Sequence, residues 1–151
     1  MRAHRIAVVA GDGVGPEVME SARRVLERAG RLWGVELGWA EFGWGCEWYR
    51  RHGQMMPPDG LDVLAGYDAI LLGAVGAPDV PDHVSLWGLL IPVRRAFRQY
   101  VNRRPVRTLP GVVSPLVAGA AIDLEIVREN NEGEYSEIGR ASCRERVLRL
   151  V

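Results

Sequence analysis

Lysine is absent from this chain of 151 residues, and arginine supplies all 19 basic side chains. Without lysine, the polypeptide as given can form no Schiff base and cannot transfer a proton through an ammonium group. Its two cysteines, Cys46 and Cys143, have neither a metal-binding spacing nor the pattern of a disulfide framework. We therefore expect Cys46 to be a reduced, partly buried thiol. The three histidines, His4, His52 and His83, are too scattered to form a metal site.

Net charge and long apolar runs are also missing. Aspartate and glutamate together number 19, so the formal net charge is zero and no bias toward nucleic acid is visible. No stretch of about 18 apolar residues exists to cross a bilayer, and the run IAVVAG near the N-terminus is too short for a secretory signal. We expect no nucleic-acid or membrane partner and a cytoplasmic location. A content of 48% hydrophobic and 25% charged residues is typical of a soluble globular protein.

What is present is an alternation of strands and helices. Apolar runs and helical spacings predict strands at 5–10, 35–39 and 68–72 and helices at 16–30 and 46–52. The first run shows no polar alternation, which is typical of a strand buried on both faces of a parallel sheet. Pro16 suits the first turn of a helix, and Gly30 is the expected end of that helix. This pattern predicts the α/β class.

The second half of the chain continues the pattern less regularly. Helical spacing extends from Leu86 to Val101, and Pro92 must either start or kink that helix, so its regular part is expected to begin near Ile91. Residues 122–126 alternate apolar and acidic side chains, which predicts a half-exposed strand. A shift toward proline, glycine and valine at 102–119 marks the expected crossover between a first domain, 1–101, and the start of a second, 102–136.

The last fifteen residues differ from the rest in composition. From Glu137 the string EIGRASCRERV resembles the translation of a common sequencing-library adapter, and arginine and glutamate replace the mixture of glycine, proline and valine upstream. We expect residues 137–151 to be a non-native tail. The biological alternative is a charged helical tail.

Three arginines and one tyrosine form the strongest candidate site: Arg94, Arg104, Arg128 and Tyr135. Each guanidinium offers a planar fork that can bind a carboxylate through two parallel hydrogen bonds. Three such groups directed at one point would hold a small dicarboxylic acid. The alternative is that they are solvated surface arginines, as most arginines are.

Two glycine-rich loops follow buried strands. The glycines of GDGVGPE, at 11, 13 and 15, do not have the spacing of the dinucleotide motif G-x-G-x-x-G, and no acidic residue ends the second strand. The first loop still presents backbone donors at a helix N-terminus, where an anion is favoured. In the second loop, Gly73 and Gly76 are expected to let backbone approach a ligand closely. The alternative for the first loop is an ordinary tight strand-to-helix turn.

Four motifs in order carry a family resemblance: GDGVGPEV, LLGAVGAPDVPDHVSLWGLL, PVRRAFRQYVNRRPVR and IVRENNEGEYS. Over residues 5–136 they resemble the β-decarboxylating dehydrogenases, the family of isocitrate and isopropylmalate dehydrogenases. PDVPDHVSLWGLL and RENNEGEYS look most like the tartrate and D-malate dehydrogenase branch, and the Lys-Trp-Asp element of the isopropylmalate branch is missing. The resemblance implies the N-terminal part of a two-domain α/β fold of the isopropylmalate dehydrogenase type, truncated, whose full-length form is a homodimer.

The resemblance also implies chemistry: NAD-dependent oxidation, with or without decarboxylation, of a 2-hydroxy dicarboxylate such as D-malate or a tartrate, assisted by Mg or Mn. Arg94, Arg104 and Arg128 match the substrate-binding arginines, Tyr135 matches the general acid, and Val14, Gly73, Gly76 and Trp87 match positions near the cofactor. The family's catalytic lysine and metal-binding aspartates correspond to sequence beyond Ser136. The chain alone is therefore expected to be inactive and to hold no metal ligand.

Three other interpretations remain open. One is isopropylmalate dehydrogenase, which depends on whether a branched apolar side chain fits near Trp87. Trp87 itself is as often a core residue as a specificity residue in such an apolar row. The second is a non-enzymatic, carboxylate-binding fragment, and the third is a general nucleotide-binding α/β domain. Arg103 replaces an apolar residue that is usual in the family and is expected to face outward.

Overall fold

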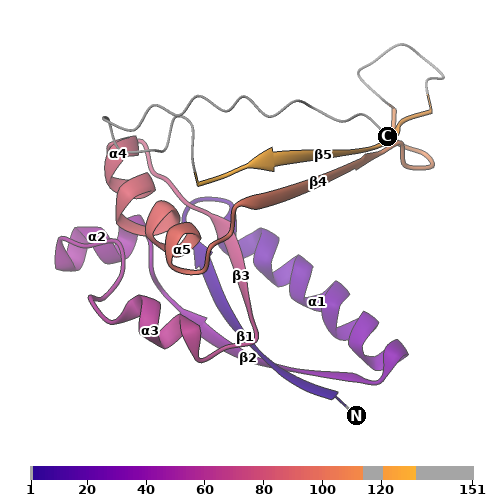
Figure 1. Cartoon of the computed structure of the whole chain (residues 1–151), viewed down its shortest axis with the longest axis horizontal. Coiled ribbons are helices and arrows are strands. Elements are labelled where there is room, and N and C mark those ends of the chain that lie inside the picture. The colour runs from indigo at the N-terminus through magenta and orange to yellow at the C-terminus, as the bar shows by residue number, and fades with distance from the viewer. Residues whose placement is uncertain (1, 114–120, 132–151) are drawn as a thin grey trace. The chain divides into compact units, whose positions relative to one another are not determined.

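The computed structural model of this chain describes residues 2–113 and 121–131 and divides into two units, Met1–Val93 and Arg94–Val151 (Figure 1). The boundary between the units lies at residues 93 and 94, whereas the predicted domain crossover begins at residue 102. Tyr135 and the predicted tail, residues 137–151, lie outside the described residues. Within the part of the chain that the structure describes, no helix is both long and apolar enough to cross a bilayer.

The first unit is built on a three-stranded parallel sheet in the order β2-β1-β3. The strands are β1 Arg2–Gly11, β2 Val35–Phe42 and β3 Ala69–Ala74. The central strand contributes Ala7, Val8 and Val9 to the core, each 3% exposed or less. A central strand of a parallel sheet is covered on both faces, so this run needs no polar alternation. The three predicted strands are confirmed.

Helices connect the strands as the α/β pattern requires. The connections are α1 Gly15–Trp33 between β1 and β2, and α2 Cys46–His52 and α3 Gly60–Ala65 between β2 and β3. The sequence predicted that α1 ends at Gly30, and this prediction is wrong. The helix ends at the left-handed Gly34, with φ of 66°. Gly30 is instead buried, and a Cβ there would lie 2.6 Å from the carbonyl oxygen of Val35, so this glycine lets the helix approach β2.

After β3 the chain forms one helical stretch in three parts, α4 Asp82–Ser85, the π-helix η1 Leu86–Leu90 and α5 Ile91–Ala96. Pro92 has no amide to donate to the preceding turn, and the backbone widens just before it: the amide of Ile91 bonds to Leu86. The predicted start of the regular helix near Ile91 is confirmed.

The predicted continuation of this helix to Val101 is wrong. Arg98 adopts a left-handed φ of 52°, and the amide of Gln99 donates to the carbonyl of Arg94 at 2.8 Å. The amide of Arg98 donates to Arg95 at 3.1 Å, which completes a Schellman motif. The chain therefore leaves the helix five residues earlier than the apolar spacing indicated.

The second unit contains an antiparallel ribbon of β4 Val101–Arg107 and β5 Asp123–Glu129. β5 confirms the strand predicted from residues 122–126, but β4 begins the stretch that the sequence assigned to a crossover. Pro105 is compatible with β4 because alternate residues of a two-stranded ribbon leave their amides on an open edge.

The carboxyl ends of β1 and β3 are packed backbone to backbone. A Cβ built at Gly73 or at Gly15 would lie 2.1 Å from the carbonyl oxygen of Ala10, and one at Gly11 would lie 2.0 Å from that of Ala74. No L side chain fits at such distances unless the strands separate.

We predict that Gly73→Ala lowers the free energy of unfolding by about 1–3 kcal/mol or more, because a methyl group must displace backbone and not a flexible side chain. Urea unfolding of the two proteins measures the difference. Gly43→Ala is the matched control, since no described atom lies within 4 Å of its Cβ position. Equal losses from both substitutions would contradict the packing argument.

Candidate functional site

The carboxyl ends of β1 and β3 meet at one edge of the sheet, where Gly11 is the register partner of Ala74. Ligands of open α/β sheets bind at this edge. Three predicted cofactor residues lie there: Val14 in the turn after β1, and Gly73 and Gly76 at the end of β3 and just beyond it. The side chain of Val14 is 57% exposed. The structure thus brings together residues that are about sixty positions apart in the sequence.

The two glycines of the second loop differ in their surroundings. Gly73 lies inside β3, and its closest approach is to the backbone of Ala10 on the neighbouring strand. Gly76 has a φ of 141°, and no described atom lies within 4 Å of its Cβ position. Gly76 is therefore the less closely packed of the two glycines, and the cofactor roles of both Gly73 and Gly76 stay predictions.

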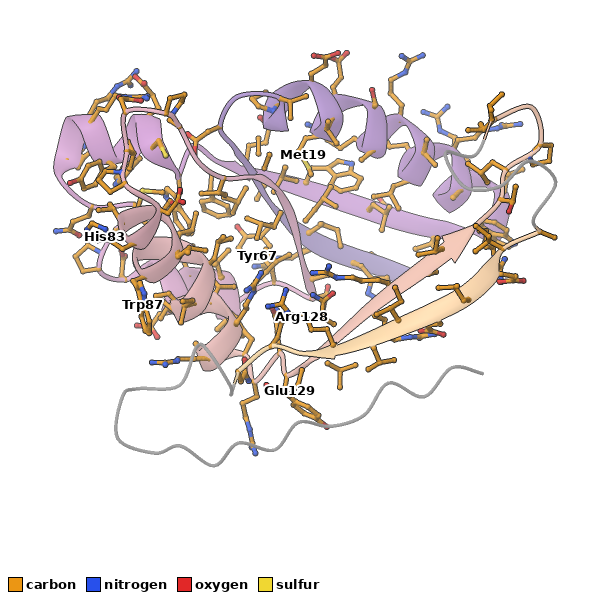
Figure 2. All side chains as sticks on the ribbon, turned by 90° about the horizontal axis from the view of Figure 1, so that it is seen from above. Met19, Tyr67, His83, Trp87, Arg128 and Glu129 are labelled. Atoms are coloured by element: carbon orange, nitrogen blue, oxygen red, sulfur yellow. The ribbon has the colours of Figure 1, made fainter. Side chains whose placement is uncertain are left out.

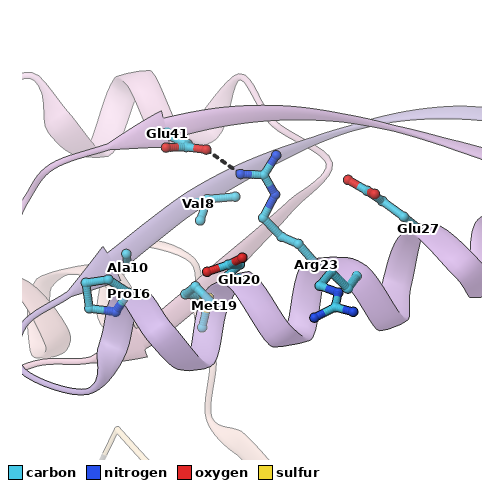
Figure 3. Close-up of a pocket in the computed structure, with 9 residues that line it drawn as sticks. Val8, Ala10, Pro16, Met19, Glu20, Arg23, Glu27 and Glu41 are labelled. Atoms are coloured by element: carbon cyan, nitrogen blue, oxygen red, sulfur yellow. Dashed lines mark hydrogen bonds and ion pairs between the residues drawn. The ribbon is translucent and has the colours of Figure 1, made fainter.

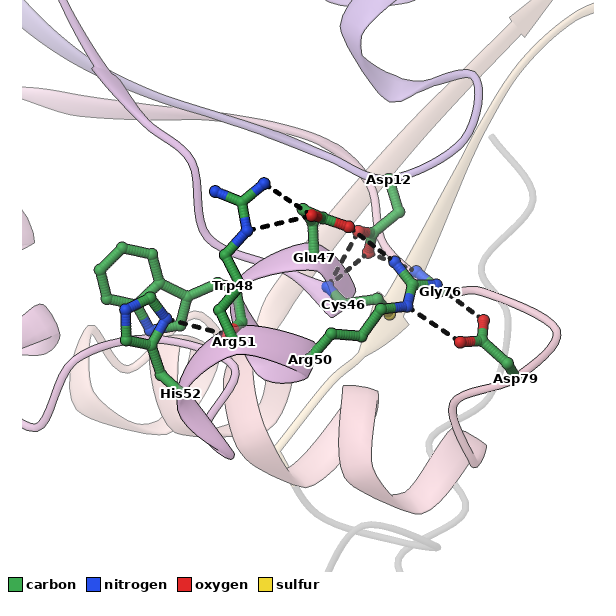
Figure 4. Close-up of polar contacts among 9 residues, drawn as sticks. All are labelled: Asp12, Cys46, Glu47, Trp48, Arg50, Arg51, His52, Gly76 and Asp79. Carbon is green, nitrogen blue, oxygen red and sulfur yellow. Dashed lines mark hydrogen bonds and ion pairs between the residues drawn. The ribbon is translucent and has the colours of Figure 1, made fainter.

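Asp12, to which the sequence assigned no role, connects three segments at this edge (Figure 4). Its amide donates to the carbonyl of Ala74 at 2.6 Å. Its carboxylate accepts the amide of Cys46 at 2.8 and 3.0 Å and the amide of Gly76 at 3.1 Å. The only local signal is an acidic residue between two glycines after a buried strand.

Asp12 acts as a distant cap of α2. Gly45 precedes the helix with a φ of 144°, and a Cβ there would lie 2.9 Å from a carboxylate oxygen of Asp12. Glycine at this position therefore makes room for a carboxylate that bonds the first helical amide, that of Cys46.

The thiol of Cys46 is fully buried, as free structural cysteines often are. Burial, a hydrogen bond to Asp12 and the charge of that carboxylate, in this order of size, together raise its pKa from the usual 9.0 to about 11. Cys46 is thus a protonated thiol at neutral pH and is not a poised nucleophile. It is a free thiol, as the sequence predicted, but it is fully and not partly buried.

Trp87 projects from η1 and is 46% exposed, so it is not a core residue (Figure 2). The next residue, Gly88, packs against the core, because a Cβ there would lie 2.6 Å from Cγ of the buried Met55. An exposed indole on a fixed helix is compatible with the predicted place near a cofactor or substrate.

The β4–β5 ribbon places two of the predicted arginines on one face. Arg128 is opposite Asn102, and Arg104 is opposite Ile126. The side chains of Arg104 and Arg128 are therefore diagonal neighbours, with Cα atoms about 7–8 Å apart. Pairing extends past Arg128, because the amide of Asn130 donates to the carbonyl of Tyr100 at 3.0 Å.

The opposite face of the ribbon holds its carboxylates. Arg103 forms an ion pair with Glu125, and Arg107 pairs with Asp123 at 2.9 Å. The Arg103 guanidinium lowers the pKa of Glu125. Arg103 therefore points away from the face of Arg104, as expected, and the residues of β4 and β5 contribute no carboxylate to the face of Arg104 and Arg128.

The remaining predicted site residues are not brought to this face by the described contacts. Arg94 lies in the last turn of α5, and its convergence on Arg104 and Arg128 stays a prediction. Tyr135 is outside the described residues. Within residues 2–113 and 121–131, no group of three or more His, Cys, Asp or Glu side chains is arranged to hold a metal ion.

A groove of about 370 Å³ runs between α1 and the sheet (Figure 3). Its floor is apolar and its rim is charged, and it is lined by Val8, Ala10, Pro16, Met19, Glu20, Arg23, Arg24, Glu27 and Glu41. Arg23 forms an ion pair with Glu41 across the rim. None of the predicted site residues lines this groove.

The sequence of the whole chain agrees with one family. The family model described as isocitrate/isopropylmalate dehydrogenase matches residues 5–148. The chain belongs to this family. The matched range includes most of residues 137–151, and the foreign origin of that segment stays a prediction.

Two relatives in the isocitrate/isopropylmalate dehydrogenase family are each 52% identical and match 92% of this chain. They are the D-malate dehydrogenase (decarboxylating) of Escherichia coli and the tartrate dehydrogenase/decarboxylase of Pseudomonas putida. The chain spans about 40% of the length of each. The branch indicated by the sequence motifs is confirmed.

A solved β-decarboxylating dehydrogenase from Thermococcus kodakarensis shares the fold, with a TM-score of 0.62 and 30% identity over 86% of this chain and 35% of that one. The predicted isopropylmalate dehydrogenase-like α/β fold is therefore confirmed.

The role of Asp12 predicts a change in the titration of Cys46. In Asp12→Asn we expect the thiol pKa to fall below about 11 but to stay above 9.0, because burial, the largest cause, remains. The pH dependence of alkylation measures it, in a Cys143→Ser background that removes the other thiol. Because the folded-state pKa exceeds the ordinary value, the contribution of Cys46 to stability is complete below pH 9 and decreases as the pH rises through 11. An unchanged pKa in a folded Asp12→Asn protein would contradict the assignment.

Proposed function

We propose that this chain is the part of an NAD-dependent, β-decarboxylating dehydrogenase that binds a 2-hydroxy dicarboxylate such as D-malate or a tartrate. The observation that carries the proposal is the ribbon face on which Arg104 and Arg128 are diagonal neighbours, opposite the face on which Arg103 and Arg107 pair with Glu125 and Asp123. The names of the relatives at 52% identity support the substrate class and the reaction.

The ribbon face suits a doubly charged acid. Each guanidinium can form two parallel hydrogen bonds to a carboxylate, and neither can lose its charge near neutral pH. Arg104 and Arg128 would neutralise the substrate carboxylates and fix the orientation of the hydroxyl-bearing carbon between them. Arg94, in the helix that precedes β4, would supply the third guanidinium. Tyr135 would be the general acid.

The carboxyl edge of the first sheet is the proposed cofactor side. NAD bound there would supply the hydride acceptor for oxidation of the hydroxyl-bearing carbon. Val14 and Gly76 are the exposed or open positions there, and Gly73 keeps the strand ends close enough to form the edge. Trp87, exposed on η1, would add a further cofactor contact. The described residues offer no ligand set for Mg or Mn, so we assign no step to a metal held by them. We further infer that the working enzyme is a cytoplasmic homodimer.

A chimera tests this proposal: residues 1–136 joined to the remaining part of the E. coli D-malate dehydrogenase. The chimera should form NADH from D-malate or tartrate, whereas the 151-residue chain alone should form none. Arg104→Ala and Arg128→Ala should each lower kcat/KM by at least about 30-fold, as expected when one partner of a close charge pair is removed.

Arg103→Ala is the matched control, since it removes an adjacent guanidinium from the opposite face and should leave kcat/KM within about threefold. Equal losses from Arg103→Ala and Arg104→Ala would refute the assignment of faces. A chimera that prefers 3-isopropylmalate to D-malate and tartrate would contradict the proposed substrate and favour isopropylmalate dehydrogenase. Calorimetric binding of a dicarboxylate by the 151-residue chain, unaffected by NAD and metal, combined with an inactive chimera would favour a non-enzymatic carboxylate-binding role.

A further inference from the structure

Helix α2 contacts the segment between β3 and α4, residues 75–81, at two points (Figure 4). At the N-terminal end of α2, the Asp12 carboxylate that bonds the amide of Cys46 also accepts the amide of Gly76 at 3.1 Å. One turn further along, Arg50 donates from Nε and from a terminal nitrogen to the two carboxylate oxygens of Asp79, at 2.9 and 2.7 Å. Both contacts join residues distant in sequence.

Arg50 and Asp79 form a bidentate ion pair, which fixes the relative orientation of the two side chains more firmly than a single ionic contact does. Glu47, one turn earlier on α2, accepts a further hydrogen bond from Arg50 at 3.0 Å and so directs the guanidinium. Glu47 also binds Arg51, at 2.7 Å, on the side that does not reach the segment. The Arg50 guanidinium lowers the pKa of Asp79, which keeps that carboxylate ionised.

Residues 75–79 have little else to hold their conformation. β3 anchors one end, and the buried Val80, whose amide donates to the carbonyl of Ala77, anchors the other. Between these ends Gly76 adopts a φ of 141°, and the described residues place nothing within 4 Å of its Cβ position. Gly76, Pro78 and Asp79 are exposed, so the two polar contacts from Asp12 and Arg50 hold the part of the segment that side-chain packing does not.

We propose that Arg50 and Asp79 are positioning residues: with Asp12 they hold residues 75–79 in the conformation that receives the dinucleotide at the carboxyl edge of the sheet. The inference rests on the proposed function for the identity of the ligand. Neither side chain needs to touch the cofactor, because both act through the backbone of the segment that contains Gly76.

Amide hydrogen exchange in the 151-residue chain tests the positioning directly. Arg50→Ala and Asp79→Ala should each accelerate exchange of the amides in residues 75–80 by about two- to fivefold, the range expected for an exposed ion pair. The double variant should show no more than either single variant, because both remove the same contact. Arg51→Ala is the control, since Arg51 binds Glu47 and not the segment, and should leave these amides unchanged.

Kinetics of the active chimera test the consequence for the cofactor. Arg50→Ala should raise KM for NAD by the same two- to fivefold and leave kcat and KM for the hydroxy acid within about twofold. Arg50→Lys should recover part of the loss, because lysine keeps the charge but cannot form the bidentate contact of a guanidinium. Unchanged exchange in both single variants, additive effects in the double variant, or a KM effect equally large in Arg51→Ala would overturn the proposal. If the unsubstituted chimera is inactive, the proposed function fails, while the exchange measurement still decides whether the pair holds the segment.

Discussion

The carboxylate of Asp12 is the constraint on which the first unit depends. Its hydrogen bonds join the end of the central strand, the start of α2 and the segment after β3, and its own amide bonds to Ala74. An ionised acceptor shared between backbone amides forms stronger hydrogen bonds than a neutral one. The glycines around it, Gly11 and Gly45, are required because any Cβ there would occupy the space of these bonds.

In the second unit the two-residue period of the strands separates charges. Asp123 and Glu125 fall on one face of the ribbon and pair with Arg103 and Arg107, while Arg104 falls on the other. The ion pairs of Arg103 and Arg107 therefore lie on one face of the ribbon. Arg104, next to Arg103 in the sequence, lies on the other face, away from these carboxylates. The run NRRPVR thus alternates between the face whose arginines form ion pairs with β5 and the opposite face of the ribbon.

Much of the fold could be predicted from the sequence because periodicity is local. β1, α1 and α2 follow from apolar spacing and from glycine and proline signals. The end of α5 could not be predicted, since arginine at residue 98 gives no sign of a left-handed conformation. Nor could β4, whose arginines and Pro105 obscure any alternation. Asp12 was missed because its partners lie 34 and 64 residues away, whereas the outward direction of Arg103 was anticipated by its departure from an apolar position.

The left-handed turn at Arg98 has a consequence for how such a ribbon can evolve. Only Gln99 and Tyr100 separate that turn from the first residue of β4, so the connector is two residues long. Insertion or deletion of a single residue in it that shifted the pairing of β4 with β5 by one position would turn every side chain of the strand to the opposite face. Arg103 and Arg104 would then exchange places, and a basic surface would become a neutralised one. The length of this connector thus decides which face of β4 carries Arg104.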